Sequence, residues 1–281
     1  MSPSPSAASH YAREGELTGR ILSALTAAGK DLDRLTADDL SPYDQFHSRG
    51  HQATSELAQL LNPRPGQALL DLGSGIGGPA RWLATTCGCR VVGLDLTEVY
   101  CRSARELSAR VGLARQTAFV CADALALPFA EAAFDLVWTQ HAAMNIADKA
   151  ELYREVARVL RPGGRFGLYD VMAGPAGAPH FPLPWSANAE WSHLLAPEGV
   201  RAAVLASGLR QRHWRDLTAE AKAWSEKAVA AQLSSKGQSG RAPSGPAIIL
   251  GPAFAEMVAN LRRSLFEDRI TVVEAVFDKA E

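Results

Sequence analysis

Asp71-Leu-Gly-Ser-Gly-Ile-Gly-Gly78 is the stretch of sequence that decides the fold. A short apolar run that ends in an acid, residues 67–71, precedes the glycines, and a helical pattern begins at Pro79. The glycines therefore occupy a strand-to-helix turn, where the lack of a side chain lets the backbone turn tightly and approach a ligand. Pro79 suits the first turn of a helix, because the N–H that proline lacks would have no helical partner there.

Two kinds of cofactor bind at such a turn, and the charge of Asp71 separates them. The spacing Gly73-x-Gly75-x-x-Gly78 matches the dinucleotide fingerprint, but a pyrophosphate bound there would lie close to the anionic Asp71. S-Adenosylmethionine has no phosphate and presents an ammonium and a sulfonium, which an acid at the strand end attracts. The sequence therefore favours methyl transfer over hydride transfer, and an NAD-dependent dehydrogenase is a distant alternative.

The composition is that of a globular chain without a marked charge. The chain has 281 residues, of which 47% are hydrophobic, and a formal net charge of −1. Lys and Arg are scattered, so nothing indicates nucleic acid or a membrane surface as a partner. No stretch approaches the roughly 20 apolar residues of a membrane span, and the first residues lack the regions of a signal peptide. We expect a cytoplasmic protein that acts on a small molecule, and a homodimer is compatible with the sequence.

The four cysteines fall close together in the predicted core, at Cys87, Cys89, Cys101 and Cys121. The pair Cys87-Gly-Cys89 would suit a metal or redox site, but no second pair or histidine cluster completes a zinc pattern. We therefore expect reduced thiols and no metal site.

The region before the glycine turn is expected to be helical. Apolar residues recur at helical spacing over 14–40, with an interruption at Gly29-Lys30, and Ser41-Pro42 breaks the pattern. The polar and aromatic stretch 43–50 is a candidate cover for a cofactor, or an ordinary loop. The expected parts of the chain are a disordered tail over 1–13, an N-terminal helical lid over 14–50 and a main domain over 51–281, with substrate cap insertions over 171–195 and 219–269.

Strands alternate with helices from residue 67 onward. The expected strands are 68–72, 90–95, 117–123, 134–138, 165–170, 209–215 and 270–277. The expected helices are 51–61, 97–111, 148–160, 197–207, 219–233 and 254–266, with a flexible segment over 234–246. Alternation of this kind implies right-handed crossovers and a parallel sheet. Ligands gather at the carboxyl ends of such strands, where the side chains are Asp71, Asp95, Asp123, Gln140 and Asp170.

Several of these segments together resemble the class I S-adenosylmethionine-dependent methyltransferases. The matching segments are 71–77, Asp95, 121–124, 134–140 and 160–164, and the likeness extends over about 54–281. Within that class the chain is similar to the sarcosine/dimethylglycine N-methyltransferases and to the small-molecule methyltransferases of the ubiquinone/menaquinone-biosynthesis type. The resemblance implies a Rossmann-like α/β fold: a mostly parallel seven-stranded sheet with helices on both faces and an antiparallel last strand.

The resemblance also implies which residues hold the cofactor. They are Asp71, Gly73, Ser74, Gly75, Gly77, Asp95, Leu96, Asp123, Ala124 and Gln140. The carboxylate of Asp95 suits both ribose hydroxyls, because it has two acceptor oxygens. Asp123 would accept from the adenine amino group, while Gln140 would bound the methionyl group. Each of the two acids is otherwise an ordinary acid at a strand end.

Methyl transfer asks little of side chains, because the sulfonium is already an activated donor. If the nucleophile is an amine or a hydroxyl, a base helps by removing its proton. His141 is the candidate base, because it follows the fourth strand and an imidazole titrates near neutrality. Asp170 would orient it or bind substrate, and His47 is a further candidate. Both histidines can equally be structural hydrogen-bonding residues.

The aromatic residues of the insertion over 171–195 bear on the acceptor. Phe181, Trp185 and Trp191 would form faces for an alkylammonium group, or would simply pack the insertion onto the sheet. No arginine stands out by its spacing as a clamp for a substrate carboxylate.

Methylation of an amine nitrogen by in-line transfer is the leading expectation, with S-adenosylhomocysteine as the product. O- or C-methylation of a phenolic, quinol or natural-product acceptor is the alternative. A protein that binds S-adenosylmethionine without catalysis is an alternative of another class.

Overall fold

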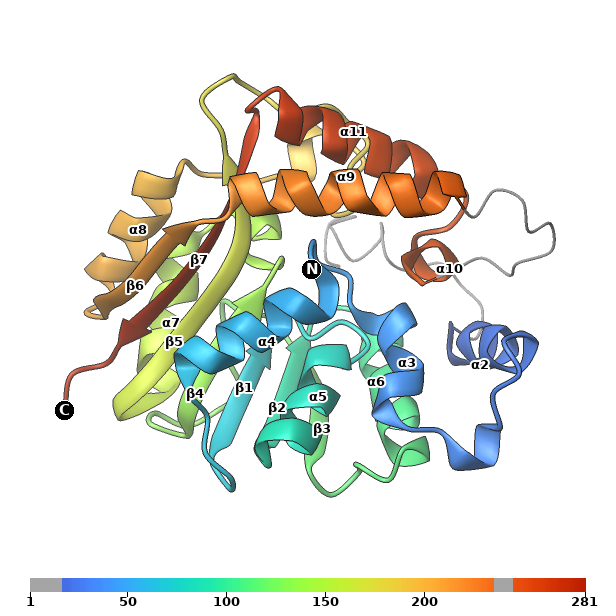
Figure 1. Ribbon diagram of the computed structural model, residues 1–281. Coiled ribbons are helices and arrows are strands. Elements are labelled where there is room, and N and C mark those ends of the chain that lie inside the picture. Colours follow the sequence, from blue (N-terminus) through green and yellow to red (C-terminus); the bar gives the residue numbers. More distant parts are fainter. Residues whose placement is uncertain (1–16, 235–244) are drawn as a thin grey trace, which may run out of the picture.

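Seven strands form a single sheet in the computed structural model, which describes residues 17–234 and 245–281. The strands are β1 (Ala68–Leu72), β2 (Arg90–Asp95), β3 (Thr117–Cys121), β4 (Phe134–Gln140), β5 (Leu160–Ala173), β6 (Arg210–Asp216) and β7 (Ile270–Asp278). Their order is β3-β2-β1-β4-β5-β7-β6. β7 runs antiparallel to both of its neighbours, and the other pairs are parallel. The expected mostly parallel, Rossmann-like sheet with an antiparallel last strand is confirmed (Figure 1).

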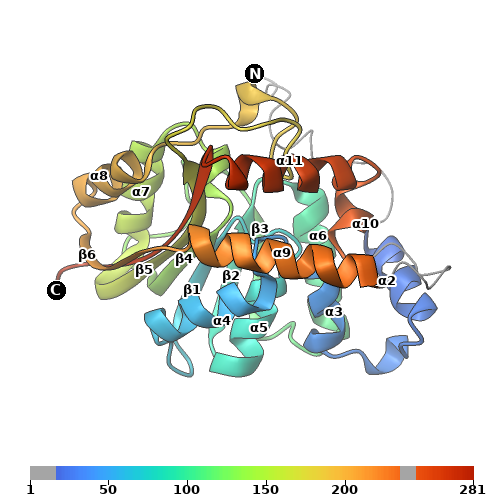
Figure 2. The same cartoon turned by 45° about the horizontal axis from the view of Figure 1, so that its top comes forward.

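Helices cover both faces of this sheet, as expected (Figure 1, Figure 2). The helices of the described residues are α2 (Leu17–Ala27), α3 (Ala37–Asp44), α4 (Gly50–Leu61), α5 (Gly78–Cys87), α6 (Glu98–Arg110), α7 (Lys149–Val159), α8 (Pro197–Ala206), α9 (Thr218–Ser234), α10 (Pro246–Leu250) and α11 (Phe254–Phe266), with short 3-10 helices η1 (Leu32–Arg34), η2 (Ala143–Asn145) and η3 (Ala189–Trp191). None of these helices is both long enough and apolar enough to cross a bilayer. The expected tail over 1–13 and most of the expected flexible segment over 234–246 lie outside the described residues.

Each face of the sheet has its own hydrophobic core, because successive side chains of a strand point to opposite faces. On β5, Tyr169 and Val171 join the core that includes α4, α5, α6, α9 and α11. Phe166 and Leu168 join the core that includes α7 and α8. A third cluster packs α2 and α3 against α6 and α10. The segment expected as an N-terminal lid is therefore packed onto the main domain through apolar contacts.

The expectation that Ser41-Pro42 breaks a helix is wrong. Pro42 lies inside α3, which ends only at Asp44. A capping box holds the start of this helix: the N–H of Asp39 donates to Thr36 Oγ1, and the Asp39 carboxylate accepts from the Thr36 N–H. The proline therefore limits the length of the helix and does not prevent it.

The bounds expected for the fifth strand, 165–170, are also wrong, because β5 spans Leu160–Ala173. Leu160, the first residue of β5, already pairs with Phe134 of β4. The N–H of Gly163 donates to the carbonyl of Lys279 over 3.1 Å. These partners are distant in sequence, so the local pattern could not show that the segment is paired.

A buried ion pair links the end of α3 to α5. Arg81 Nη2 lies 2.8 Å from Asp44 Oδ2, and the two side chains are only 1% and 2% exposed. The Asp44 backbone lies so close to Gly78 that a Cβ at position 78 would meet the Asp44 carbonyl at 2.4 Å. The pair therefore fixes the residues that follow α3 against the start of α5.

The variant Arg81→Ala should lower the free energy of unfolding by about 3 to 5 kcal/mol, because the Asp44 carboxylate would stay buried without its partner. The double variant Asp44→Asn with Arg81→Met should lower the free energy of unfolding by less than R81A alone, since it leaves no uncompensated charge. Urea titration of the wild type and both variants measures these differences. A loss below about 1 kcal/mol in R81A, the size seen for surface pairs, would contradict the role given to this pair.

Glu274 is a carboxyl group buried in β7. Its Oε1 lies 3.7 Å from His213 Nε2, and its Oε2 has no hydrogen-bond partner among the described residues. Burial raises the pKa of Glu274 to about 7; Glu56 adds to the rise, whereas Arg49 and Arg215 oppose it. The side chain is therefore neutral in mildly acidic solution and becomes charged as the pH rises through this value.

Ionisation of Glu274 should destabilise the fold as the pH rises from about 4.5 through about 7, because the unfolded chain ionises more easily. The Glu274→Gln variant keeps the shape and does not titrate. It should match the wild type at about pH 4, where Glu274 is mostly neutral in both the folded and the unfolded chain, and exceed its free energy of unfolding by about 1 to 3 kcal/mol at about pH 8. Urea titrations at both values check this, and a more stable wild type at the higher pH would contradict it.

Candidate functional site

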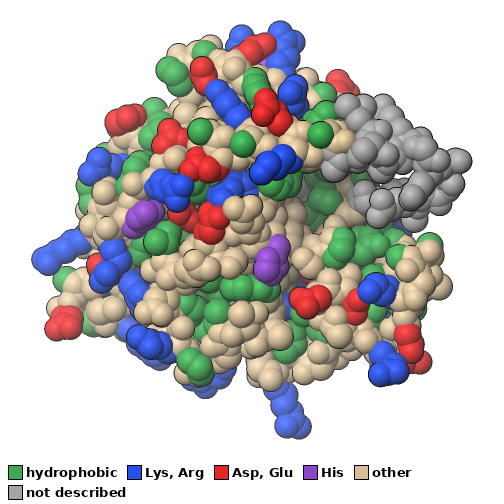
Figure 3. Space-filling model, viewed as in Figure 1, with side chains coloured by type: hydrophobic (Ala, Val, Ile, Leu, Met, Phe, Trp, Pro, Cys, Tyr) green, Lys and Arg blue, Asp and Glu red, His purple; other side chains and the backbone are tan. Residues whose placement is uncertain are grey.

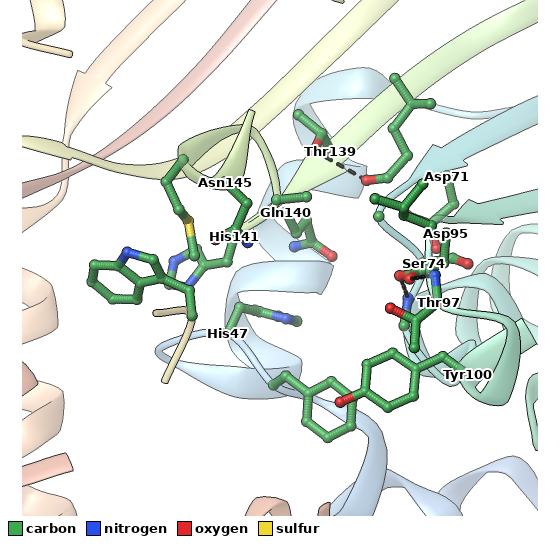
Figure 4. Close-up of a pocket in the computed structure, with 18 of the residues that line it drawn as sticks. His47, Asp71, Ser74, Asp95, Thr97, Tyr100, Thr139, Gln140, His141 and Asn145 are labelled. Carbon is green, nitrogen blue, oxygen red and sulfur yellow. Dashed lines mark hydrogen bonds between the residues drawn. The ribbon is translucent and has the colours of Figure 1, made fainter. Parts of the chain in front are cut away.

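A cavity of about 220 Å³ lies at the carboxyl ends of β1, β2 and β4. Figure 4 shows two groups of polar side chains along it. We call the first group the acidic end; it consists of Asp71, Ser74, Asp95, Thr97 and Tyr100. We call the second group the histidine end; it consists of His47, Ser48, His141 and Asn145. Gln140, the last residue of β4, lies between the two groups.

The glycine turn forms the wall of the acidic end. Gly73 has a φ of +75°, and a Cβ at this position would lie 2.2 Å from the Cβ of Ala142. Both the conformation and the space therefore require glycine. The N–H groups of Gly73 and Ser74 donate to the carbonyl of Leu94 over 2.8 and 3.0 Å, which ties the turn to β2.

The carboxylate of Asp95 holds the same turn from the end of β2. Its Oδ2 accepts from the N–H of Gly75, and its Oδ1 accepts from the N–H of Thr97, both over 2.9 Å. Burial raises the pKa of Asp95, and these two backbone donors oppose the rise. Each carboxylate oxygen retains capacity for a further hydrogen bond, so the side chain can still bind a ligand.

Asp71 is buried at the end of β1 and is only half satisfied. Trp138 Nε1 donates to Asp71 Oδ1 over 2.8 Å, and Oδ2 has no partner among the described residues. Burial raises the pKa of Asp71 to about 7; the Trp138 hydrogen bond opposes this rise, and the charge of Asp95 adds to it. A buried oxygen without a donor is costly, so this site favours a ligand that carries a hydrogen-bond donor or a positive charge.

Three more expected residues lie at the outer side of the acidic end. Asp123 follows β3, is exposed and accepts from the N–H of Leu125 over 2.9 Å. Leu96 is 50% exposed although it lines the cavity. Ala124 also lines the cavity. A planar ligand group can therefore pack against Leu96 and Ala124 and donate a hydrogen bond to Asp123.

His141 is held at the histidine end by its backbone and its ring. It has a left-handed φ of 49°, and its N–H donates to the carbonyl of Tyr169 over 2.8 Å. The imidazole stacks on the Tyr169 ring with centroids 5.0 Å apart, and Nε2 lies 3.3 Å from Ser48 Oγ. Burial lowers the pKa of His141 well below its usual value, and His47 adds to this shift. The ring is therefore neutral at neutral pH, and the same burial makes it a weaker base than a free imidazole.

His47 lies beside it, with ring centroids 6.0 Å apart. Its Nε2 lies 3.0 Å from the carbonyl of Gly50 and 3.1 Å from Thr54 Oγ1. Because a carbonyl only accepts, Nε2 carries the proton. Burial lowers the pKa of His47 to about 4, so both histidines are uncharged and His47 is committed to holding the start of α4.

Asp170, expected to act in catalysis, does not line this cavity among the described residues. Its carboxylate accepts from the N–H of Met144 over 3.1 Å and from the N–H of Val171 over 2.9 Å. Lys149 nearby donates to the carbonyls of Ala143, Ile146 and His193. Asp170 and Lys149 therefore position η2, the turn that carries Asn145.

The expected aromatic group is reduced to one member. Trp185 lines the cavity, and its Nε1 donates to Ser192 Oγ over 3.1 Å. Phe181 packs against the hydrophobic core on the α4 face, and Trp191 lies in η3. Neither residue belongs to the described lining of the cavity. Gly77 does not belong to this described lining either, and forms the N-cap of α5.

Several lining residues had no predictive signal in the sequence. Phe46 lies in the stretch 43–50 that was proposed as a cover, so its region was found. Others are Tyr100, Met144, Ile146, Leu152, Pro184, Ile249, Leu250 and Leu261. Their positions follow the ordinary apolar pattern of helices and loops, which does not distinguish a cavity wall from a core.

A family comparison fits this geometry. Residues 70–168 match the sequence profile described as a methyltransferase domain. These residues are a methyltransferase domain. The match begins within β1, ends within β5 and includes the glycine turn, Asp95, Gln140 and His141.

Relatives and a solved structure extend the comparison. The chain is 36% identical over 134 residues to methyltransferase GfsG of Streptomyces halstedii, which covers 48% of each chain. It is 30% identical over 178 residues to the glycine/sarcosine/dimethylglycine N-methyltransferase of Actinopolyspora halophila, covering 63% of this chain and 32% of that protein. Geranyl diphosphate C-methyltransferase from Streptomyces coelicolor A3(2) has a similar fold, with a TM-score of 0.66, 18% identity and coverage of 99% and 100%.

These comparisons limit what can be transferred to this chain. The alignments span about half the length of the first curated relative and less of the next two. The names of the relatives include N-, O- and C-methyltransferases. Structures of similar fold include a cyclase as well as methyltransferases, so the fold alone does not specify the reaction.

The close approach of Gly73 and Ala142 can be tested with a matched glycine. Gly112 has nearly the same φ, +74°, but a Cβ added there would meet no atom within 4 Å. Gly112→Ala should cost about 1 to 2 kcal/mol of stability from backbone strain alone, and Gly73→Ala should cost about 1 to 3 kcal/mol more from overpacking.

The double variant Gly73→Ala with Ala142→Gly should recover most of this additional loss, because it removes the atom that the new Cβ meets. Urea titration of the four proteins measures the comparison. Equal losses of the free energy of unfolding in G73A and G112A would show that the turn accommodates a Cβ without loss of stability and that position 73 does not require glycine for space.

Proposed function

We propose that this chain is an S-adenosylmethionine-dependent methyltransferase that acts on a small-molecule acceptor. The observation that carries the proposal is the pairing of two ends in one cavity of a methyltransferase domain. The acidic end has the glycine turn and the carboxylates of Asp71 and Asp95, and the histidine end has an uncharged imidazole. Some structures of similar fold are complexes with S-adenosylmethionine or S-adenosylhomocysteine, which supports the same cofactor here.

The residues of the acidic end fit this cofactor. Asp71 Oδ2 and Ser74 Oγ are buried polar atoms without a partner among the described residues, and a ligand with an ammonium group supplies the missing donors. A pyrophosphate would instead place negative charge beside Asp71 and Asp95. Asp95 would hold the ribose hydroxyls and Asp123 the adenine amino group. When bound, S-adenosylmethionine supplies a methyl group activated by a sulfonium.

The chain's own residues perform the remaining tasks at the histidine end. His141 accepts the proton of the acceptor, since its ring is neutral and lies at this end. Ser48 Oγ lies 3.3 Å from His141 Nε2 and 3.0 Å from the Tyr169 hydroxyl. Ser48, which is held by the Tyr169 hydroxyl, therefore orients the imidazole through Nε2, and the proton of the acceptor would go to the other ring nitrogen, Nδ1. The apolar residues around the cavity exclude water, which leaves the nucleophile free to attack in line.

The lining of the histidine end bears on the acceptor atom. The sequence favoured an amine nitrogen, with the three aromatic residues as a site for an alkylammonium group. Only Trp185 of these lines the described cavity, and no acid accompanies it among the described residues of the histidine end. A neutral base beside uncharged polar groups suits a hydroxyl oxygen. We therefore place O-methylation first, with N-methylation second and C-methylation third.

Two variants test the two ends separately. Asp95→Ala should weaken the binding of S-adenosylmethionine by about tenfold or more, because it removes the acceptor that holds both turn and ribose. His141→Asn should lower methyl transfer by about a hundredfold while the affinity for S-adenosylhomocysteine stays within about twofold of the wild type. Calorimetric titration measures affinity, and transfer from labelled S-adenosylmethionine to an acceptor panel measures turnover.

Four outcomes would contradict parts of this proposal. Unchanged affinity in D95A would remove the cofactor assignment at that residue, and unchanged turnover in H141N would remove the base. Tight binding of S-adenosylmethionine with no transfer to any acceptor, including whole-cell extract, would identify a non-catalytic binding protein. Binding of NADH that S-adenosylmethionine does not displace would favour a dehydrogenase.

A further inference from the structure

The part of the cavity beyond the strand ends has an apolar wall. Six residues form it: Met144, Pro184, Trp185, Ile249, Leu250 and Leu261. They come from η2, from the segment that follows β5, and from α10 and α11. Trp185 uses its only polar side-chain atom on Ser192, so the indole can offer the cavity only apolar surface. These residues belong to elements outside the alternating strands and helices that build the acidic end.

The charges of the cavity are confined to a few acids. Among the described lining residues, the charged side chains are Asp44, Asp71, Asp95 and Asp123, and no Lys or Arg is present. Asp44 is paired with Arg81, and the other three acids follow the strand ends. The histidine end and the apolar wall, as far as the structure describes them, therefore present only uncharged groups to a ligand.

The cations of the neighbouring elements already have partners or lie elsewhere. Lys149 donates to three backbone carbonyls beneath η2. Arg49 Nη2 lies 2.7 and 2.6 Å from the two carboxylate oxygens of Glu56; its Nη1 has no partner among the described residues, but Arg49 does not belong to the described lining of the cavity. Arg201 and Arg210, on α8 and β6, are exposed and do not belong to the described lining of the cavity. None of these four side chains is placed as a clamp for a carboxylate or a phosphate.

Two unpartnered atoms show where a polar group of the ligand would bind. Asn145 Oδ1 and Gln140 Nε2 are buried and have no partner among the described residues, and both residues line the cavity. The first accepts from an O–H or N–H, and the second donates to an oxygen. A ligand with uncharged hydroxyl or carbonyl groups satisfies both, and a buried polar atom is stable only when it is so satisfied.

We propose that the acceptor is an uncharged molecule with a largely apolar body that packs on the apolar wall and a hydroxyl that reacts beside His141. This inference rests on the proposed function and names its substrate class. An anionic acceptor would lose its hydration without gaining a cation, which disfavours its binding. The apolar body gains from leaving water in proportion to the area that it buries.

A matched pair of probes tests the charge preference. Methyl 6-hydroxy-2-naphthoate and 6-hydroxy-2-naphthoate share the naphthol ring and hydroxyl, and only the second carries a negative charge. Calorimetric titration of the full chain with saturating S-adenosylhomocysteine should show that the neutral ester binds about tenfold more tightly or better. Equal or tighter binding of the anion would overturn the inference.

A variant pair shows whether the apolar wall sets this preference. Leu261→Arg should shift the ratio of the two affinities by about tenfold towards the anion. Leu205→Arg is the matched control, because Leu205 lies on α8, is 42% exposed and is not part of the described cavity lining. The control should leave the ratio unchanged. A ratio that moves equally in both variants would overturn the role of the wall.

Failure of this inference can be distinguished from failure of the proposed function. If S-adenosylhomocysteine binds and the anion is preferred, the methyltransferase assignment stands and the substrate class is wrong. If S-adenosylhomocysteine does not bind, the proposed function fails, and the same probe titrations without it still measure the charge preference. Thermal unfolding of both arginine variants confirms folding, and the wild-type titrations decide the charge preference by themselves.

Discussion

The buried ion pair between Asp44 and Arg81 is the constraint on which the site depends. Arg81 lies one turn into α5, which begins at the end of the glycine turn, and Asp44 ends α3, shortly before Phe46, His47 and Ser48. One interaction therefore fixes two walls of the cavity relative to each other. Neither charge tolerates loss of its partner, because neither can be hydrated where it lies. The absence of a side chain at Gly78 allows the two segments to approach closely enough for the pair to form.

Most strands of the sheet were predictable because the sequence pattern within each strand is enough to indicate it. The apolar runs of β1 and β2 end at acids, and the pattern of α11 is amphipathic, so these elements were expected with the bounds that the structure has. The errors have non-local causes. β5 begins at Leu160 because β4 is available there as a partner, and Pro42 stays in α3 because a capping box holds the other end of the helix. The bounds expected for the lid and the cap insertions remain predictions.

The two ends of the cavity differed in how far they could be predicted. Asp71, Asp95 and Gln140 were expected together, because the carboxyl ends of parallel strands meet at one edge of a sheet. The apolar wall comes from segments whose positions depend on tertiary packing, and of the three aromatic residues that the sequence suggested only Trp185 belongs to the described lining of the cavity. Asp170 satisfied the same strand-end rule as Asp95, yet its carboxylate faces the backbone of η2. The position of a residue at the end of a strand predicts that it lies at the ligand-binding edge of the sheet. The turns that follow the strands determine whether its side chain is accessible from the cavity.

The division of the cavity between the sheet and its covering segments separates two kinds of sequence change. Changes in Met144, Trp185, Leu250 or Leu261 alter the apolar wall. They leave the glycine turn and Asp95 untouched, because these four residues lie outside β1 and β2 and outside the glycine turn. New specificities can therefore arise by exchange of these segments while the sheet stays as it is. Recombination between proteins of this fold can accordingly change the apolar wall in a single step, without rebuilding the glycine turn and the acidic end.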